Sequence, residues 1–377
     1  MNKDIKKINY GIAIRHAFEY LLENYPEVFV IGQGLWSPWY VGNTMTDLDS
    51  KFGASRVIDT PVSESACTGA AVGASLCGMR PIVVHPRIDF MLYALDSIVN
   101  QAAKWSHMVG GQAHPGVTIR GIINRGGEQG AQHSQALHSW FAHIPGLRVV
   151  MPYSVEDARD LLIASVLCND PVMFIDDRWL YDNEATLDPV KEIDIRDEGP
   201  KVIKSGSDIT IVGCGFSTDL ALKTAAILLE NGTSAEVIDL RVLNPFDAEA
   251  IIRSVEKTGV LAVIDGGWKN CGIAGEVISS VVEKISPLKL KKSPLRITLP
   301  HCPAPTAGNL EKIYYPTVET IFVFSFTSSL FTSLRFLYLA VRSSMLLKSP
   351  PVVDLSLTTD SKNSVNLMCL VISSFFI

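Results

Sequence analysis

The 377-residue sequence lacks several patterns that would define its class at once. It contains no run of five basic residues and carries a formal net charge of −6, which argues against a nucleic-acid-binding surface. Its seven cysteines are scattered without a Cys-x-x-Cys pair, so they indicate neither a disulfide framework nor a zinc motif. The first residues form neither an apolar secretion signal nor an arginine- and serine-rich leader. We therefore expect a cytoplasmic protein with reduced thiols.

The length and the order of the expected elements indicate two α/β domains. A chain of this length allows two domains, each with its own core. Strands and helices alternate in residues 1–181, a polar stretch at 182–206 is typical of a linker, and strands and helices alternate again in 207–320. Such alternation predicts parallel sheets with right-handed crossovers. We therefore expect two doubly wound α/β domains, followed by an atypical tail at 321–377.

The stretch from Arg56 to Gly78 contains the most informative local pattern. An extended run ends at Pro61, which fixes its own φ and disfavours helix at the residue before it. Ser63 can then cap a helix that begins at Glu64, where the partial positive charge of a helix end favours a carboxylate. Three glycines lower the helix propensity by roughly 1 kcal/mol each, which indicates close packing. From spacing alone, Glu64 either stabilises the helix end or points into a cleft.

Together with later motifs, this stretch resembles the β subunits of 2-oxoacid dehydrogenase E1 components of the pyruvate and branched-chain type. These thiamine-diphosphate enzymes belong to the transketolase-like pyrimidine-binding family. The motifs occur in the family's order and are Arg56-Val-Ile-Asp-Thr-Pro61 with Glu64, Asp96-Ser-Ile-Val-Asn100, Gln132-His-Ser-Gln135 and Phe141-Ala-His-Ile-Pro-Gly146. The resemblance covers residues 8 to 320. It implies a pyrimidine-binding domain followed by a transketolase C-terminal-like domain.

The resemblance also implies a set of site residues in the first domain. Glu64 matches a residue that bonds a ring nitrogen of the cofactor's aminopyrimidine, so it is a catalytic and cofactor-binding candidate that we expect to be partly buried. Phe90 matches an aromatic residue stacked on the same ring, and Asp89 beside it is assigned to the cofactor site. His133 matches a channel-facing residue, and an imidazole suits proton exchange near neutral pH. From the residues alone, the pattern favours an ordinary core residue at Phe90 and a surface residue at His133.

The sequence departs from the family directly after the expected strand Val28–Gly32. The family places two acidic residues there, and the second belongs to its proton network, whereas this chain has Gln33 and Gly34. This departure predicts that proton transfer, or even activity, differs from that of a typical family member. A transketolase-like split-enzyme subunit and a non-catalytic assembly partner remain alternatives.

The role of two further groups of side chains near this strand can be interpreted in two ways. Trp36, Trp39 and Tyr40 follow the strand closely. They either pack a loop or line a substrate channel. His85 and Arg87 replace more apolar or acidic residues of the family. They either bind an anionic substrate or lie on the surface.

The expected activity depends on partners that the resemblance implies. Members of the family anchor the diphosphate through Mg²⁺ with a Gly-Asp-Gly motif, which this chain lacks. We therefore assign no metal ligand here and expect an E1 α subunit to hold Mg²⁺ and diphosphate in an α2β2 heterotetramer. The reaction would be oxidative decarboxylation of a pyruvate-like 2-oxoacid, with acyl transfer to a lipoyl-bearing E2. Some members hold K⁺ at a turn that matches Ser165 to Asp170. The residues do not select one 2-oxoacid, because substrate pockets in the family draw on both subunits.

Beyond residue 320 the resemblance ends. The run from Ile321 to Val341 has Arg335 as its one charged residue, and hydropathy alone favours a weak transmembrane helix there. The Ser-, Leu- and Phe-rich composition without a clear amphipathic period favours an atypical extension over a membrane anchor. We therefore expect no membrane partner.

Overall fold

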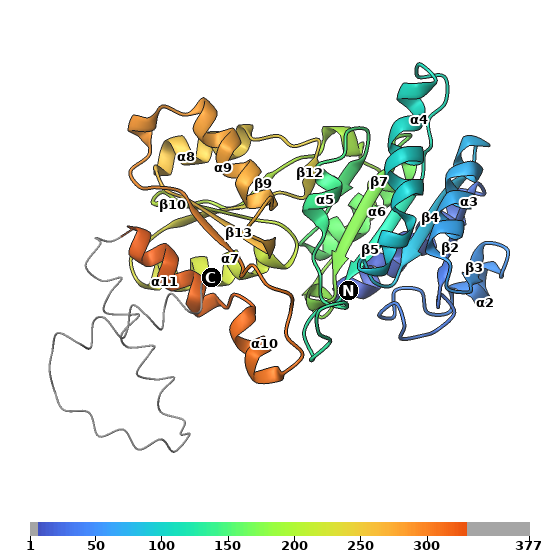
Figure 1. Ribbon diagram of the computed structural model, residues 1–377, viewed down its shortest axis with the longest axis horizontal. Coiled ribbons are helices and arrows are strands. Elements are labelled where there is room, and N and C mark those ends of the chain that lie inside the picture. Colours follow the sequence, from blue (N-terminus) through green and yellow to red (C-terminus); the bar gives the residue numbers. More distant parts are fainter. Residues whose placement is uncertain (1–6, 330–377) are drawn as a thin grey trace, which may run out of the picture. The chain divides into compact units, whose positions relative to one another are not determined.

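The computed structural model describes residues 7–329, and a seven-stranded sheet forms the centre of the first domain (Figure 1). In spatial order, its strands are β12 (Val242–Asn244), β6 (Arg148–Val150), β7 (Val172–Asp177), β5 (Thr118–Ile123), β4 (Arg80–His85), β2 (Val28–Gln33) and β3 (Val57–Thr60). Neighbouring strands are parallel, except that β12 runs antiparallel to β6. The central strands are buried on both faces, which explains their largely apolar sequences.

Helices cover both faces of this sheet. On one face, α1 (Tyr10–Asn24) packs against α6 (Val155–Leu167). On the other face lies α3 (Glu64–Leu76), next to the segment that follows β4. The caps of α1 and α6 are side chains of the expected type, since Asn9 Oδ1 accepts a hydrogen bond from the Ile12 N–H and Ser154 Oγ accepts one from the Asp157 N–H.

The helix expected after Asp89 is divided into three consecutive pieces. A 3₁₀ turn, η1 (Phe90–Ala94), leads into a π-helical stretch, η2 (Asp96–Ala102), and then into α4 (Ala103–Met108). π-Helical turns inside helices occur frequently at functional sites. Here the irregular segment packs directly on α3. Two short helices, α2 (Leu48–Phe52) and α5 (His138–Ala142), complete this domain.

The second domain is a five-stranded sheet with helices around it. In spatial order, its strands are β14 (Leu295–Leu299), β13 (Leu261–Trp268), β10 (Ile209–Gly213), β11 (Ala235–Asp239) and β9 (Lys201–Lys204). Only β9 is antiparallel to its neighbour. The helices are α7 (Phe216–Glu230), α8 (Glu249–Thr258), α9 (Ile273–Lys284), α10 (Gly308–Tyr314) and α11 (Val318–Ser329). The predicted fold class, two doubly wound α/β domains, is confirmed.

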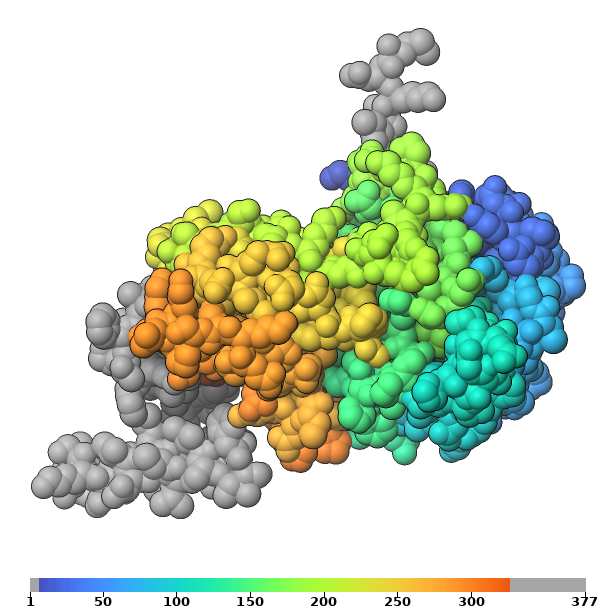
Figure 2. Space-filling model, turned by 90° about the horizontal axis from the view of Figure 1, so that it is seen from above, coloured from blue at the N-terminus to red at the C-terminus, as the bar shows by residue number. Residues whose placement is uncertain are grey.

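The segment 182–206, which we expected to be a linker, contains regular structure. β8 (Glu184–Ala185) pairs with β1 (Ile8–Asn9) of the first domain, and β9 joins the sheet of the second domain. Yellow-green atoms of this part of the chain lie on the surface in Figure 2. The segment therefore binds to both domains, while its predicted boundaries stay predictions.

The beginning of the expected tail is also packed. Ile321 in α11 is fully buried against the core of the second domain, which includes residues of α7. The rest of the expected tail, 330–377, lies outside the described residues. Within 7–329, none of the helices combines the length and the apolar character that crossing a membrane requires.

Candidate functional site

A small hollow lies where β2, β3 and β4 end. Its lining comes from those strand ends and from the start of α3, and consists of Gly32, Gln33, Thr60, Ser63, Glu64, Cys67, Val83, Val84, His85 and Pro86. The carboxyl ends of parallel strands are where doubly wound sheets bind ligands. The topology thus places Glu64 at the edge of the sheet that is suited to a ligand.

Glu64 is the first residue of α3 and is half-buried, as expected. Within residues 7–329, no protein group forms a hydrogen bond to its carboxylate. Ser63 occupies the cap position, but its side chain makes no capping hydrogen bond, so the capping predicted for it is wrong in that detail. A carboxylate at a helix N-terminus that faces a hollow without a protein partner can accept a hydrogen bond from a ligand.

Close backbone packing forms the floor of the hollow. A Cβ atom on Gly32 would lie 2.3 Å from the carbonyl oxygen of Val84 on the neighbouring strand. On the opposite side, the Cys67 thiol lies 3.3 Å from Thr60 Oγ1 and connects the first turn of α3 to the end of β3. The contact between Cys67 and Thr60 therefore holds the first turn of α3, which begins at Glu64, against the end of β3.

Of the two residues that depart from the family, Gln33 lines the hollow and Gly34 directly follows it. Gln33 Nε2 donates a hydrogen bond of 2.8 Å to the Tyr40 hydroxyl group. Gly34 has a φ of +70°, and a Cβ atom there would lie 2.2 Å from Tyr40 Cδ1. The N–H groups of Gly34 and Leu35 both donate to Asp59 Oδ1, at 2.6 and 3.2 Å. The Tyr40 ring thus occupies the space that a side chain at position 34 would need.

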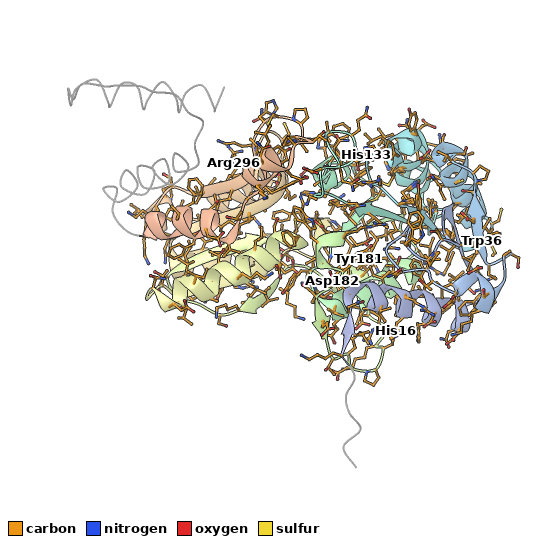
Figure 3. All side chains as sticks on the ribbon, turned by 90° about the horizontal axis from the view of Figure 1, so that it is seen from below. His16, Trp36, His133, Tyr181, Asp182 and Arg296 are labelled. Carbon is orange, nitrogen blue, oxygen red and sulfur yellow. The ribbon has the colours of Figure 1, made fainter. Side chains whose placement is uncertain are left out.

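The neighbouring tryptophans are arranged differently from Tyr40. Trp36 is half exposed, and its indole N–H donates to the Val57 carbonyl group at 2.9 Å. Trp39 is 71% exposed. Of the two interpretations of this aromatic loop, packing therefore applies to Tyr40, and Figure 3 shows Trp36 at the periphery of the first domain.

Asp89, Phe90 and His133, three of the predicted site residues, lie together. The Phe90 and His133 rings meet edge to face, with centroids 5.1 Å apart, which is a favourable aromatic geometry. Asp89 Oδ1 accepts hydrogen bonds from the backbone N–H and the side-chain amide of Gln135, at 3.0 and 3.1 Å. Asp89 Oδ2 is buried without a partner among the described residues. Burial raises the pKa of Asp89, although the hydrogen bonds from Gln135 oppose this shift.

Arg87 holds the loop that carries His133. Its Nη1 donates to the carbonyl oxygens of Asn124 and His133, at 3.2 and 3.0 Å, and its Nη2 donates to Gln129 Oε1 at 2.7 Å. The guanidinium is half-buried rather than on the open surface. His85 is buried, 3.2 Å from Thr68 Oγ1, and burial lowers its pKa to about 4. At neutral pH, His85 therefore adds no positive charge to the site.

The predicted site residues form two neighbouring groups rather than one cluster. Among residues 7–329, no hydrogen bond or ring contact joins Glu64 to Phe90 or His133. The two groups are connected through the chain, because Pro86 lines the hollow while Arg87 contacts the His133 loop. They are also connected through packing, because α3 lies against η1, which begins at Phe90.

The sequence interpretation missed a buried ionic network behind the site. Arg120 and Asp176 are fully buried and form two hydrogen bonds of 2.8 Å, and Arg120 also donates to Thr44 Oγ1 and to the Tyr181 hydroxyl group at 2.9 Å. The available signal was an arginine inside an otherwise apolar strand, since such a residue needs a buried partner. We interpret the network as structural, because its charged and hydroxyl groups form their hydrogen bonds with one another.

Two buried side chains of the first domain bind β13 of the second. His138 Nε2 lies 2.9 Å from Asp265 Oδ1 within β13, and both side chains are fully buried. Arg125 donates to Asp177 of its own domain at 2.6 Å and to the Gly266 carbonyl group of β13 at 2.8 Å. The region described contains no group of three or more His, Cys, Asp or Glu side chains arranged to hold a metal ion.

Comparisons with known proteins agree with this architecture. Family models for the transketolase pyrimidine binding domain and the transketolase C-terminal domain match residues 6–183 and 200–321. The β subunit of acetoin:2,6-dichlorophenolindophenol oxidoreductase from Cupriavidus necator is 37% identical over 331 residues, which cover 84% of this chain and 96% of that protein. The mitochondrial pyruvate dehydrogenase E1 component subunit beta-1 of Arabidopsis thaliana is 37% identical over 321 residues, which cover 84% and 88%.

Solved structures support the fold. A split-gene transketolase, described as an inactive β4 tetramer, matches with a TM-score of 0.69 at 20% identity, over 85% of this chain and 98% of that one. At this identity the likeness concerns architecture alone. The identities to the curated relatives extend over both domains, and the pyruvate dehydrogenase subunit among them is an E1 β subunit by name. The chain therefore belongs to the family of 2-oxoacid dehydrogenase E1 β subunits, which are built from a transketolase pyrimidine-binding domain and a transketolase C-terminal domain.

Proposed function

We propose that this chain is the β subunit of a thiamine-diphosphate-dependent E1 enzyme that oxidatively decarboxylates a pyruvate-like 2-oxoacid and transfers the acyl group to lipoyl. The observation that carries the proposal is the carboxylate of Glu64, which faces the hollow at the strand ends and has no protein partner among residues 7–329. Family membership supports it, since the relatives include pyruvate dehydrogenase E1 β subunits. They also include acetoin oxidoreductase β subunits. The relatives therefore do not select the substrate, and the pyruvate-like 2-oxoacid is part of our proposal.

The site fits the aminopyrimidine part of thiamine diphosphate. Two carboxylate groups retain unused oxygen atoms, those of Glu64 at the hollow and Asp89 Oδ2. The half-buried ring of Phe90 adds an aromatic surface nearby. When bound, thiamine diphosphate supplies an electron sink for decarboxylation. We assign Glu64 to the ring nitrogen as the group that holds a proton there, and Phe90 and Asp89 to binding of the ring.

His133 is assigned to proton exchange with the substrate. Its edge-to-face contact with Phe90 places the imidazole beside the proposed ring-binding residues. Arg87 fixes the backbone at His133 through the carbonyl oxygen of that residue. A positioned imidazole can donate or accept a proton near neutral pH. Arg87 is therefore a positioning residue for this step.

The proposal requires further subunits. The part of the chain that is described offers no cluster of metal ligands, and we assign Mg²⁺ and the diphosphate to an E1 α subunit in an α2β2 heterotetramer, with a lipoyl-bearing E2 as acceptor, in the cytoplasm. At the turn expected to hold K⁺, the carbonyl oxygens of Val166 and Cys168 accept hydrogen bonds from Arg80 Nη1, at 2.9 and 3.1 Å. Arg80 already brings a positive charge there, so potassium is left out of the proposal.

The test is Glu64→Gln in the complex reconstituted with the cognate α subunit. Loss of a group that handles a proton lowers the rate by about 10²- to 10⁴-fold, and we expect that loss for 2-oxoacid decarboxylation. Glu230→Gln, at the exposed end of α7, is the matched control and should leave the rate unchanged. A Glu64→Gln rate within about threefold of the unmodified complex would contradict the assignment.

The same complex separates the alternatives. Turnover of a phosphorylated keto sugar without lipoyl would identify a transketolase-like enzyme. Failure to bind thiamine diphosphate in the presence of the α subunit would identify an assembly partner without catalytic function. Both results are read from the unmodified complex and do not depend on the Glu64 variant.

A further inference from the structure

The last side chains of three neighbouring strands form a polar row beside the start of α3. Thr60, Gln33 and His85 end β3, β2 and β4, and Gln33 is the middle one because β2 lies between the other two strands. Side chains alternate between the two faces of a strand. Ile31, two residues before Gln33, packs against the core on the α3 side of the sheet. The side chain of Gln33 therefore also faces α3.

The first turns of α3 present one face to this row. Glu64, Cys67 and Thr68 are three and four residues apart, so they lie on the same side of the helix. The Cys67 thiol lies 3.3 Å from Thr60 Oγ1, and Thr68 Oγ1 lies 3.2 Å from His85 Nε2. The two outer members of the row thus each have a partner on α3. On the helix face, Glu64 is left for the middle of the row.

The middle of the row is nevertheless not bonded to α3. Gln33 and Glu64 line the same hollow, but within residues 7–329 no hydrogen bond joins them. An amide group carries two donor hydrogens and an acceptor oxygen, and Gln33 uses only one end of it, for Tyr40. The hollow is therefore bounded by an amide edge and a carboxylate that both lack a partner among the described residues.

Tyr40 is held in place independently of Gln33. Its ring occupies the space beside Gly34, where a Cβ atom would lie 2.2 Å from Tyr40 Cδ1, and its carbonyl oxygen accepts a hydrogen bond from Arg178. Its hydroxyl group accepts the bond of 2.8 Å from Gln33 Nε2. A side chain that is oriented in advance loses less freedom when a ligand binds. Tyr40 can therefore fix the direction of the Gln33 amide.

We propose that Gln33 is a second ligand contact of the hollow, which binds the polar edge of the ring that Glu64 holds, and that Tyr40 is the positioning residue for its amide. The inference rests on the proposed function, which assigns the aminopyrimidine of thiamine diphosphate to this hollow. An amide offers a donor and an acceptor side by side. This suits an amino group next to a ring nitrogen, as in the recognition of adenine by glutamine.

The amide of Gln33 is neutral, so it adds no charge to the hollow. Among the described residues that line the hollow, the titratable ones are Glu64, Cys67 and His85, and His85 is neutral near pH 7 because burial lowers its pKa to about 4. Asp59, on the neighbouring strand, accepts hydrogen bonds from the backbone that follows β2. Glu64 is thus the one carboxylate of this lining, and a second carboxylate at position 33 would repel it.

The first test measures the Kd of thiamine diphosphate by calorimetry in the complex with the cognate α subunit. Gln33→Met keeps the length of the side chain and removes its polar end, so Kd should rise about 5- to 30-fold. The matched control is Gln112→Met, at an exposed glutamine whose side chain forms no hydrogen bond in the described part of the chain. Equal Kd values for the two variants, at equal thermal unfolding temperatures, would overturn the inference.

Tyr40→Phe tests whether Tyr40 acts through Gln33. This variant keeps the ring beside Gly34 and removes the hydroxyl group, so Kd should rise by a smaller factor of about two to five. In the Gln33→Met background it should have no further effect, because the amide that it orients is gone. Independent effects of the two substitutions would refute the positioning role of Tyr40.

Gln33→Glu provides a readout that a merely structural role would not change. The ionised carboxylate has no donor for the ring and repels Glu64, whereas the protonated group offers a donor and an acceptor as the amide does. The ratio of its Kd to that of the unmodified complex should therefore fall about three- to tenfold between about pH 8 and 6, while the ratio for Gln33→Met stays constant. A constant ratio for Gln33→Glu would overturn the inference, and this variant also decides the question if Gln33→Met does not fold.

Binding and turnover together separate this inference from the proposed function. If the binding of thiamine diphosphate depends on Gln33 but no 2-oxoacid is decarboxylated, the proposed function fails and the Gln33 contact stands. If a pyruvate-like 2-oxoacid is decarboxylated but Kd is indifferent to the residue at position 33, the contact fails and the proposed function stands. A complex that does not bind thiamine diphosphate would contradict both.

Discussion

Gly34 is a position at which this chain should tolerate a side chain poorly. Its φ of +70° is strained for other residues, and a Cβ atom would meet the Tyr40 ring at 2.2 Å. The backbone conformation costs a non-glycine residue about 1–2 kcal/mol, and an overpacked contact costs about 1–3 kcal/mol more. Gly34→Ala should therefore lower the free energy of unfolding by about 2–5 kcal/mol.

Two comparisons separate the backbone cost from the clash. Gly78 has a φ of +90°, and nothing lies within 4 Å of the Cβ position there, so Gly78→Ala should show the backbone cost alone. In a Tyr40→Ser background, the added methyl group of Gly34→Ala should no longer meet the ring, so most of the steric cost should disappear. The double-mutant cycle should then give a coupling energy of about 1–3 kcal/mol.

The measurement is urea unfolding of the full chain, followed by tryptophan fluorescence. A Gly34→Ala cost no larger than that of Gly78→Ala would refute the reasoning, because the Tyr40 ring would then not fill the space at position 34. Confirmation would mean that the acidic residue of the family cannot simply be restored here. Gly34 would then be required because the Tyr40 ring occupies the space in which the family places an acidic side chain.

Two further predictions concern buried charge. Asp176→Ala leaves the fully buried Arg120 without its carboxylate partner, so the free energy of unfolding should fall by about 3–5 kcal/mol in urea. Asp194→Ala, which breaks an exposed pair with Arg196, should lower it much less. Similar costs for both variants would contradict the burial argument. Because burial lowers the pKa of His85 to about 4 in the folded state, its stabilising contribution is present above pH ~6.5 and is lost as the pH falls toward 4, about 3 kcal/mol in all. His85→Gln should therefore flatten the decline of unfolding free energy between pH 7 and 4, and an unchanged slope would show that His85 is not held neutral.

The sequence was sufficient for the elements that depend on local pattern. Alternating apolar runs predicted the parallel strands, and Pro61 followed by Glu64 predicted the junction between β3 and α3. Glu64 lies at the hollow because the carboxyl ends of parallel strands share one edge of a sheet. The resemblance assigned Phe90 and His133 to the site, but their contact was not predicted, since the two residues are far apart in the chain.

Other features depend on long-range contacts that no local pattern encodes. The bond between Asp89 and Gln135 spans 46 residues, and that between Arg120 and Asp176 spans 56. The division of residues 90–108 into 3₁₀, π and α turns lies where the segment packs against α3, a contact that the local sequence does not show. The role of Tyr40 was left open. The sequence shows that position 34 has no side chain, but it does not show that the Tyr40 ring occupies the adjacent space.

β12 has a consequence for any attempt to produce the two domains separately. This strand belongs to the second half of the chain, yet it covers the outer side of β6 in the first sheet. A fragment cut within 182–206 would leave the backbone of β6 open, and such an edge recruits strands from other molecules. A fragment extended past Asn244 would include β12 and so keep β6 paired. A soluble form of the first domain therefore requires residues that lie in the second half of the sequence.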